Sequence, residues 1–216
     1  MAITNCIFEC SRGLAMETVD GALLEDVTVS NLTMRQIYTA PIFLRLGGRM
    51  RGPAGTPEGK LRRVLISHVV AEGVEARQGI LVVGLAGHPV EDVTLDNLLI
   101  EFSGGGTSGQ AAREVPEMER EYPEPGSFGP TTSWGLYARH AGNLTLHHVE
   151  LRTAAPDGRP AIYLEDVSGA QFERVKAAPS AGAAMFLMKN VQDFSTRSCP
   201  GVANTDRADV AGPERL

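Results

Sequence analysis

The chain has 216 residues and a formal net charge of −6, and its 24 glycines and 13 prolines favour many turns and few helices. Basic residues are scattered among acidic ones, which argues against nucleic acid as a partner, because phosphate binding needs a concentrated basic surface. No run approaches the ~20 apolar residues that a membrane span needs, so we expect no membrane partner either.

Two short apolar patterns alternate along the chain, and both are typical of β-strands. In chain order, the first predicts strands at residues 3–8, 27–34, 64–71, 93–100, 144–151 and 170–177. The second predicts strands at residues 14–17, 42–45, 80–83, 136–139, 162–165 and 185–188. Side chains alternate across a strand, so every other position can point into a core. A unit that recurs in this way predicts a stacked solenoid rather than a closed globule.

The spacing of the repeats predicts the architecture. The shortest intervals, from Leu144 to Ala170 and from Ala170 to Phe194, are 26 and 24 residues, enough for one turn of a three-sheet parallel β-helix. We therefore expect an all-β chain with few or no helices. It would form a single domain over residues 1–199, with insertions at 47–60 and 103–133 and a C-terminal tail at 200–216.

The N-terminal end carries two further expectations. The first strand begins almost at Met1, so we expect no signal peptide, and localisation stays open. A solenoid needs polar caps, since a terminal turn otherwise leaves apolar side chains and strand edges in water. No such cap precedes residue 3, which predicts a homo-oligomer in which another copy covers the N-terminal turn. The three cysteines do not describe a disulfide framework.

Stacking the second set of strands places outward side chains in two rows. One row would contain Ala15, Phe43, Leu81, Tyr137, Tyr163 and Phe186, and the next Glu17, Arg45, Val83, Arg139, Glu165 and Met188. Aromatic faces beside charged groups are what a carbohydrate cleft presents, although loops or a partner subunit could equally cover the row. The candidate substrate-binding residues are Arg12, Phe43, Arg45, Tyr137, Arg139, His140, Tyr163 and Glu165.

The insertion at 103–133 allows two interpretations. Loops of this length are usually functional or disordered. Tyr122, Phe128 and Trp134 are aromatic residues that we expect to fix the loop against the solenoid wall. The loop could lie over the aromatic row as one wall of a cleft, or reach outward as an oligomerisation arm.

Several segments resemble the C-terminal half of glycoside hydrolase family 28, which comprises the polygalacturonases and their relatives. The resemblance lies in residues 5–8, 12–18, 24–34 and 40–43, and later in 122–125, 134–140 and 159–166, and it runs from about Ile3 to about Asn190. It implies a right-handed parallel β-helix, a pectin-lyase-like solenoid. It also implies hydrolysis of glycosidic bonds in a plant-cell-wall polysaccharide, pectic or neutral, by a protein of a typically secreted or periplasmic family. No cofactor is expected.

The resemblance also directs attention to one carboxylate. The family's catalytic aspartates and its Gly-His-Gly turn precede the matched region and are absent from this chain, which therefore looks truncated or diverged. The family's Arg-Ile-Lys motif aligns with Ala15-Met16-Glu17. Glu17 would repel an acidic sugar, which Arg or Lys would bind, and it suits a neutral sugar or a cation better. The catalytic candidates are Glu17 and, near it, Asp20.

Two functions from different classes remain open at this point. The first is a glycoside hydrolase with Glu17 and its neighbours lining the site. The second is a non-catalytic β-helix, a carbohydrate-binding or assembly module left after loss of the catalytic turns. In both, the partner is a polysaccharide or oligosaccharide.

Apart from the binding candidate His140, the histidines favour structural roles. His68 and His148 occupy the repeat position of Asn31 and Asn97, where we expect stacked polar side chains at a turn. His147 would face outward beside His148, but no Cys or carboxylate at metal spacing accompanies the pair. The sequence therefore predicts no metal site.

Overall fold

The computed structural model describes residues 1–49, 51–180 and 182–216. The described residues are 57% strand and 4% helix, and thirteen strands form one sheet. Its pairings are parallel, except that β12 and β13 run antiparallel to β11. The expected all-β class is therefore confirmed, as one large and mainly parallel sheet. None of the described helices is long and apolar enough to cross a membrane.

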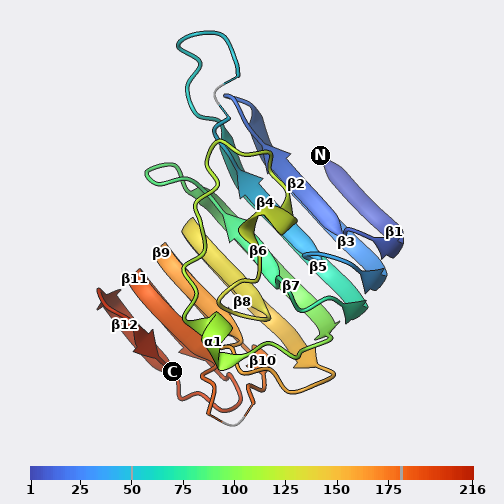
Figure 1. Cartoon of the computed structure of the whole chain (residues 1–216), viewed down its shortest axis with the longest axis vertical. Helices are drawn as coiled ribbons and strands as arrows, with labels where there is room; N and C mark the ends of the chain where they lie inside the picture. The colour runs from blue at the N-terminus through green and yellow to red at the C-terminus, as the bar shows by residue number, and fades with distance from the viewer. Residues whose placement is uncertain (50, 181) are drawn as a thin grey trace.

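The elements follow one another in a regular order (Figure 1). The strands are β1 (Ala2–Ser11), β2 (Leu14–Thr18), β3 (Leu23–Ile37), β4 (Ile42–Leu46), β5 (Lys60–Val74), β6 (Ile80–Val83), β7 (Val90–Phe102), β8 (Leu136–Thr153), β9 (Ile162–Glu173), β10 (Lys176–Ala177), β11 (Phe186–Arg197), β12 (Thr205–Val210) and β13 (Glu214–Arg215). The two short helices, α1 (Ser108–Ala111) and η1 (Pro125–Phe128), both lie in the segment between β7 and β8.

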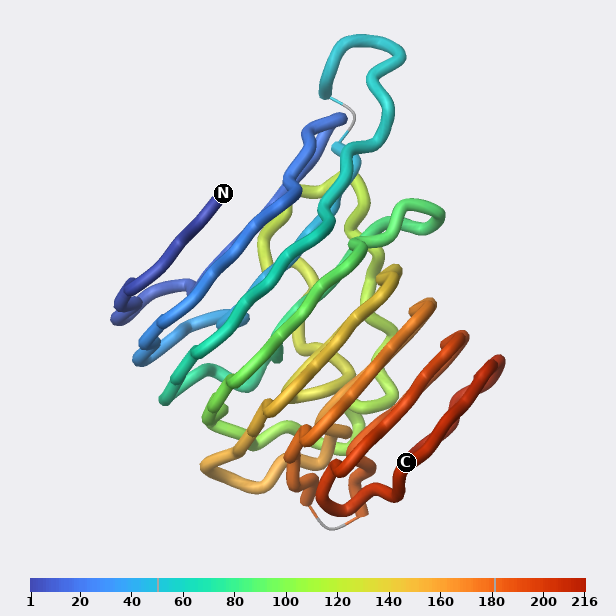
Figure 2. Tube along the Cα trace, turned by 180° about the vertical axis from the view of Figure 1, so that it is seen from behind, coloured from blue at the N-terminus to red at the C-terminus, as the bar shows by residue number. Residues whose placement is uncertain are grey.

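The strands stack in two ladders that meet in β8. The long strands β1, β3, β5 and β7 pair in sequence order with one another and then with the second part of β8. The short strands β2, β4 and β6 pair in the same order and then with the first part of β8. Both views show successive strands side by side from the N-terminal to the C-terminal end (Figures 1 and 2). After β8 the chain continues in β9, which pairs with both parts of β8, and then in β11, which pairs with β9 along its whole length.

Left-handed residues bend the long strands at matching positions. Asn31, His68, Asn97 and His148 have φ between 51° and 58°. Asn adopts this conformation more readily than most side chains. At the first bend, Asn31 Nδ2 donates to Asn5 Oδ1 of the neighbouring strand at 3.1 Å. These bends let one strand turn without leaving its ladder, so side chains far apart in sequence remain in vertical rows.

Inward side chains form one continuous apolar core. One row contains Val29, Ile66, Leu95, Leu146 and Phe172, which follow each other in the register and are no more than 1% exposed. Burial of each such side chain contributes about 1.5–3 kcal/mol, so the core fixes which side chains point outward.

The phase of β11 differs from the sequence prediction. Phe186 and Met188 were expected to point outward, but they pair with Ile162 and Leu164 and are fully buried. Residues 185–188 are uniformly apolar, so the sequence does not show which of these side chains point inward. The outward residues are Leu187 and Lys189, which therefore end the two rows.

The two ends of the sheet differ. At the C-terminal end, β12 and β13 pair with β11, and the residues after 199 thus fold back along the last strand. At the N-terminal end, β1 pairs with β3, and Cys6 and Phe8 are only half-buried. The oligomer that would cover this end remains a prediction. The loop after β4 spans residues 47–59, and Met50 within it lies outside the described residues.

Candidate functional site

The short strands bring the expected outward row together. The register places Ala15, Phe43, Leu81, Tyr137 and Tyr163 next to one another, and Leu187 follows Tyr163. A parallel row places Glu17, Arg45, Val83, Arg139, Glu165 and Lys189 beside it. Side chains from residue 15 to residue 189 are thus brought together on one face of the sheet.

The segment between β7 and β8 covers the middle of the aromatic row. Phe43 and Tyr137 pack with Val115 and Phe128 of this segment in a second apolar cluster, and the Phe43 and Phe128 rings meet edge to face at 6.2 Å. The segment therefore lies over the row and does not reach outward as an arm. Phe43 is fully buried, so the expectation that it contacts a ligand is wrong for this structure. Covering exposed apolar side chains is favourable, which explains the contact.

The aromatic residues of the segment differ in their roles. Phe128 and Trp134 are 1% exposed, and Trp134 packs edge to face against Phe102 at 5.9 Å. Tyr122 is 61% exposed, so the expectation that it fixes the segment is wrong. Phe128 and Trp134 hold the segment from its second half.

Two buried arginines hold the backbone of the same segment. Arg45 Nη2 donates to the carbonyls of Glu117 and Met118 at 3.0 and 2.9 Å, and its Nη1 donates to Gly84 at 2.9 Å. Arg139 donates to the carbonyls of Val115 and Pro116, both at 2.8 Å. The sequence interpretation assigned Arg45 and Arg139 to a substrate, but most of their donors bind the chain itself.

Burial also affects the pKa of Arg45. Loss of hydration, together with the positive charge of nearby Arg139, lowers the pKa of Arg45 to about 10. Arg45 nevertheless stays protonated at neutral pH. It therefore keeps its hydrogen bonds to the covering segment.

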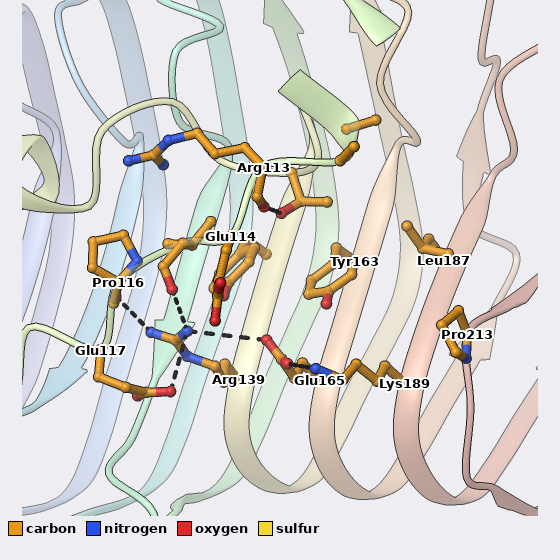
Figure 3. Close-up of a pocket in the computed structure, with 15 residues that line it drawn as sticks. Arg113, Glu114, Pro116, Glu117, Arg139, Tyr163, Glu165, Leu187, Lys189 and Pro213 are labelled. Carbon is orange, nitrogen blue, oxygen red and sulfur yellow. Dashed lines mark hydrogen bonds and ion pairs between the residues drawn. The ribbon is translucent and has the colours of Figure 1, made fainter. Parts of the chain in front are cut away.

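A cavity of about 720 Å³ opens beside the covering segment, the residues between β7 and β8 (Figure 3). Its floor contains Tyr137, Arg139, Tyr163 and Glu165, and residues 111–117 form one wall. Figure 3 shows Arg139, Glu165 and Lys189 on three neighbouring strands along its lower edge. The cavity is therefore built by the C-terminal half of the two outward rows.

Tyr137 and Tyr163 give the cavity its aromatic surface. Their rings stack with centroids 5.3 Å apart and planes 15° apart. Tyr137 is 1% exposed, whereas Tyr163 is half-buried and lines the cavity together with Leu187. Burial raises the pKa of both phenols, and for Tyr163 the negative charge of Glu165 adds to the rise, so both stay protonated and can donate. Tyr137 Oη is buried and has no hydrogen-bond partner among the described residues.

Charged side chains line the edge of the cavity. Arg139 Nη1 lies 3.3 Å from Glu117 Oε1 and 4.0 Å from Glu165 Oε2, so these two carboxylate oxygens lie within about 7 Å of each other. Glu165 also accepts from Lys189 Nζ at 2.7 Å. Arg139 Nε is buried without a partner in the described part of the chain. The cavity thus combines one aromatic face with carboxylates and cations.

His140 lies outside the cavity. Its Nδ1 is 2.6 Å from Asp166 Oδ2 and its Nε2 is 3.1 Å from Glu117 Oε2, and the side chain is 10% exposed. The imidazole therefore links the covering segment to β9. In this position His140 orients Glu117 and does not line the cavity beside Tyr163.

Glu17 lies apart from the cavity. Three strand steps separate it from Arg139 in the row, or roughly 14 Å at ~4.8 Å per step. Glu17 is exposed, yet the protein around it removes part of its hydration. This desolvation and the negative charge of Glu124 raise the pKa of its carboxyl. Arg12, also exposed, forms an ion pair with Glu124 at 2.6 Å.

Asp20 occupies a turn. It follows β2 with φ of 55°, and its Oδ2 lies 3.8 Å from Arg49 Nη2 of the next loop. Its Oδ1 is buried and unpaired within the described residues. Glu17 and Asp20 are therefore near each other in sequence, but neither lines the cavity beside Tyr163.

A second cluster corrects an expectation about histidines. The carboxylate of Asp96 lies 2.7 Å from His147 Nδ1, so the expectation that no carboxylate accompanies His147 and His148 is wrong. Asp96 is far from His147 in sequence, but β7 and β8 pair these two residues. The sequence could have indicated this contact, because the repeat frame aligns residues 93–97 with 144–148 and so places Asp96 beside His147.

Comparison with known proteins gives no match to this chain, whether among protein families, curated proteins or solved structures.

Proposed function

We propose that this chain is a carbohydrate-active protein of the glycoside hydrolase family 28 type, which binds a polysaccharide or oligosaccharide in the cavity beside Tyr163. The observation that carries the proposal is the Tyr137–Tyr163 stack, in which the half-buried Tyr163 lines the cavity next to Glu165 and Lys189. A sugar ring can lie with its C–H face on the exposed part of the Tyr163 ring. Its hydroxyl groups can then donate to Glu165 and accept from Lys189.

The architecture that accompanies this proposal is a right-handed parallel β-helix. Its support is the recurrent parallel register of the long and short strands and the left-handed bends at equivalent positions. The single core along these strands also agrees with stacked turns.

Hydrolysis of a plant-cell-wall polysaccharide is the activity that the family resemblance favours. Glycosidases use two carboxyl groups about 5–9.5 Å apart, and the oxygens of Glu117 and Glu165 that face Arg139, within about 7 Å of each other, do not exceed that range. One of the two must donate a proton. Glu165 is paired with both Arg139 and Lys189, which suits a carboxylate anion rather than an acid. Glu17, whose pKa is raised, is the better acid, but it lies on a different part of the row.

The ion pairs of Glu165 favour a second candidate, a non-catalytic carbohydrate-binding module. In that case Glu165 and Lys189 orient a sugar on Tyr163 without cleaving it. Binding and cleavage are separable by experiment, because the first needs the Tyr163 face and the second needs a proton donor as well.

Calorimetric titration with neutral and pectic oligosaccharides tests the binding step. We expect wild type to bind one of these classes and Tyr163→Ala to bind it about tenfold more weakly, since an aromatic contact contributes ~0.5–1.5 kcal/mol. Tyr38→Ala is the matched control, because Tyr38 is 53% exposed and lies outside the cavity. Absence of binding to either class would overturn the proposal.

A reducing-sugar assay tests the catalytic step on the same substrates. Release that falls in Glu17→Gln would support hydrolysis with Glu17 as a catalytic residue. Equal release by Glu17→Gln and wild type would remove Glu17 from the mechanism. Binding without any release would identify the second candidate function.

A further inference from the structure

Asp96, His147 and His148 form a cluster on a different strand segment from the sugar cavity. Asp96 lies on β7 and is the register partner of His147 on β8. His147 Nδ1 is 2.7 Å from Asp96 Oδ1 and 3.2 Å from His148 Nδ1, and one ligand atom from each of the three residues lies within 4.8 Å of the others. Two ring nitrogens and one carboxylate oxygen thus lie together in one small cluster.

The backbone explains why two consecutive histidines face the same side. Neighbouring side chains in a strand normally point to opposite faces. His148 has φ of 51°, and this left-handed bend turns its ring toward His147, with ring centroids 3.9 Å apart and planes 65° apart. The bend therefore brings the rings of two adjacent residues to the same side of the strand.

Protons alone cannot satisfy the contacts of this cluster. Arg174 Nη1 lies 2.8 Å from His148 Nε2, and a guanidinium only donates, so this Nε2 must accept. A neutral His148 then carries its proton on Nδ1, where it points at His147 Nδ1.

His147 Nδ1 faces a second demand. Ionised Asp96 needs a proton on that nitrogen, because a carboxylate only accepts. One nitrogen cannot donate to Asp96 and accept from His148 at the same time. One of the contacts is left unfavourable as long as only protons occupy the cluster.

A metal cation removes this conflict, because it accepts lone pairs from all three atoms. Imidazole nitrogen and carboxylate oxygen are ligands of zinc and related first-row ions. Bonds of about 2.0–2.1 Å place tetrahedral ligand atoms roughly 3.3 Å apart. The separations of 2.7 and 3.2 Å need only a small expansion to reach that value. We propose that Asp96, His147 and His148 form a binding site for a divalent transition-metal ion, with zinc as the ion that fits the donor set.

Surrounding residues support the three ligands. Asn97 Nδ2 donates to Asp96 Oδ2 at 2.8 Å, which leaves Oδ1 free to face His147. Such outer hydrogen bonds orient metal ligands. Glu173 is the register partner of His147 on β9 and lines the same surface depression as Asp96 and His147. Glu173 or water can complete the coordination.

Arg174 competes with the metal. Metal binding at His148 Nδ1 requires the imidazole proton to move to Nε2, where it would face the Arg174 guanidinium. Arg174 is exposed and can turn away, but its charge also opposes a cation nearby. Removing Arg174 should therefore tighten metal binding, an effect that a merely structural role of the histidines would not produce.

The test is calorimetric titration of the chelator-treated, untagged chain with zinc chloride. We expect one zinc per chain in wild type and at least tenfold weaker binding in Asp96→Asn and in the double variant His147→Ala/His148→Ala. His68→Ala is the matched control, because His68 is exposed and occupies the same bend position as His148. It should leave the affinity unchanged. Arg174→Gln should tighten binding several-fold.

Three results would overturn the site. They are absence of saturable binding in wild type, unchanged affinity in the folded double variant, and an equal loss in His68→Ala. If the double variant does not fold by circular dichroism, Asp96→Asn and Arg174→Gln carry the test. Cobalt added in place of zinc gives a second readout, since its visible absorption should appear in wild type and be lost in Asp96→Asn.

Discussion

Tyr163 stacks on Tyr137, with ring centroids 5.3 Å apart, and of the two only Tyr163 is partly exposed. Tyr137 is held from below by the sheet and from the side by the covering segment, so it supports the Tyr163 ring without contacting solvent. The covering segment therefore closes one half of the aromatic row and leaves the other half open.

The Tyr163 ring should matter more than its hydroxyl. Tyr163→Phe keeps the stacked face, so we expect oligosaccharide affinity within about twofold of wild type, whereas Tyr163→Ala loses about tenfold. Calorimetric titration with the same oligosaccharide measures both. An equal loss in both variants would mean that the hydroxyl, and not the ring face, makes the contact.

Arg45 should be a stability residue. Arg45→Met leaves the carbonyls of Gly84, Glu117 and Met118 without their donor, and each carbonyl that stays buried and unsatisfied costs about 1–3 kcal/mol. We expect a clear loss in the free energy of unfolding by urea and faster proteolysis within residues 103–135. Arg35→Met is the control, since Arg35 is exposed and should change little. Equal stability of the two variants would contradict the anchoring role of Arg45.

The Asp157–Arg159 pair should make stability depend on acid pH. Both side chains are buried, and Arg159 Nη2 donates to Asp157 Oδ2 at 2.7 Å. Burial raises the pKa of Asp157, but hydrogen bonds from the Arg159 side chain and backbone outweigh it, and the net pKa is lowered. The contribution is therefore fully present above the unfolded pKa of about 3.9 and is lost as the pH falls through the folded-state pKa.

Asp157→Asn should remove that pH dependence. At neutral pH we expect a loss of about 3–5 kcal/mol, because an uncompensated Arg159 stays buried. The difference from wild type should shrink below pH ~4. Urea unfolding at several pH values measures it, with Asp206→Asn as an exposed ion-pair control. A difference that stays constant down to acid pH would argue against this assignment.

The vertical core rows predict unequal effects of neighbouring residues on β5. Ile66 is fully buried, whereas Leu65 is 41% exposed on the opposite face. Ile66→Ala should cost about 2–5 kcal/mol of unfolding free energy, and Leu65→Ala much less. Similar losses at both positions, measured by urea unfolding, would contradict the register.

Much of the sheet could be predicted from the sequence, because the alternation of apolar residues along most strands shows which side chains point inward and which point outward. The order Ala15, Phe43, Leu81, Tyr137 and Tyr163 follows from alternation alone. At residues 185–188 every side chain is apolar, so nothing distinguishes the inward from the outward positions, and only Lys189 marks the phase.

The site was harder to predict, because it depends on a segment without a repeat. Arg45 and Arg139 are charged and outward in the pattern, which suggests ligand contacts. Their actual partners are backbone carbonyls of residues 84 and 115–118, which leave no trace in the sequence. The Asp96–His147 contact was within reach, since the repeat frame aligns these residues, but the left-handed bend at His148 was needed to bring the second ring beside them.

A crystal structure of the chain with the oligosaccharide that binds best tests the central proposal most directly. We predict a sugar ring against the exposed part of the Tyr163 ring, within hydrogen-bond distance of Glu165 and Lys189. A sugar bound only near Glu17, or on another face of the sheet, would contradict the proposal.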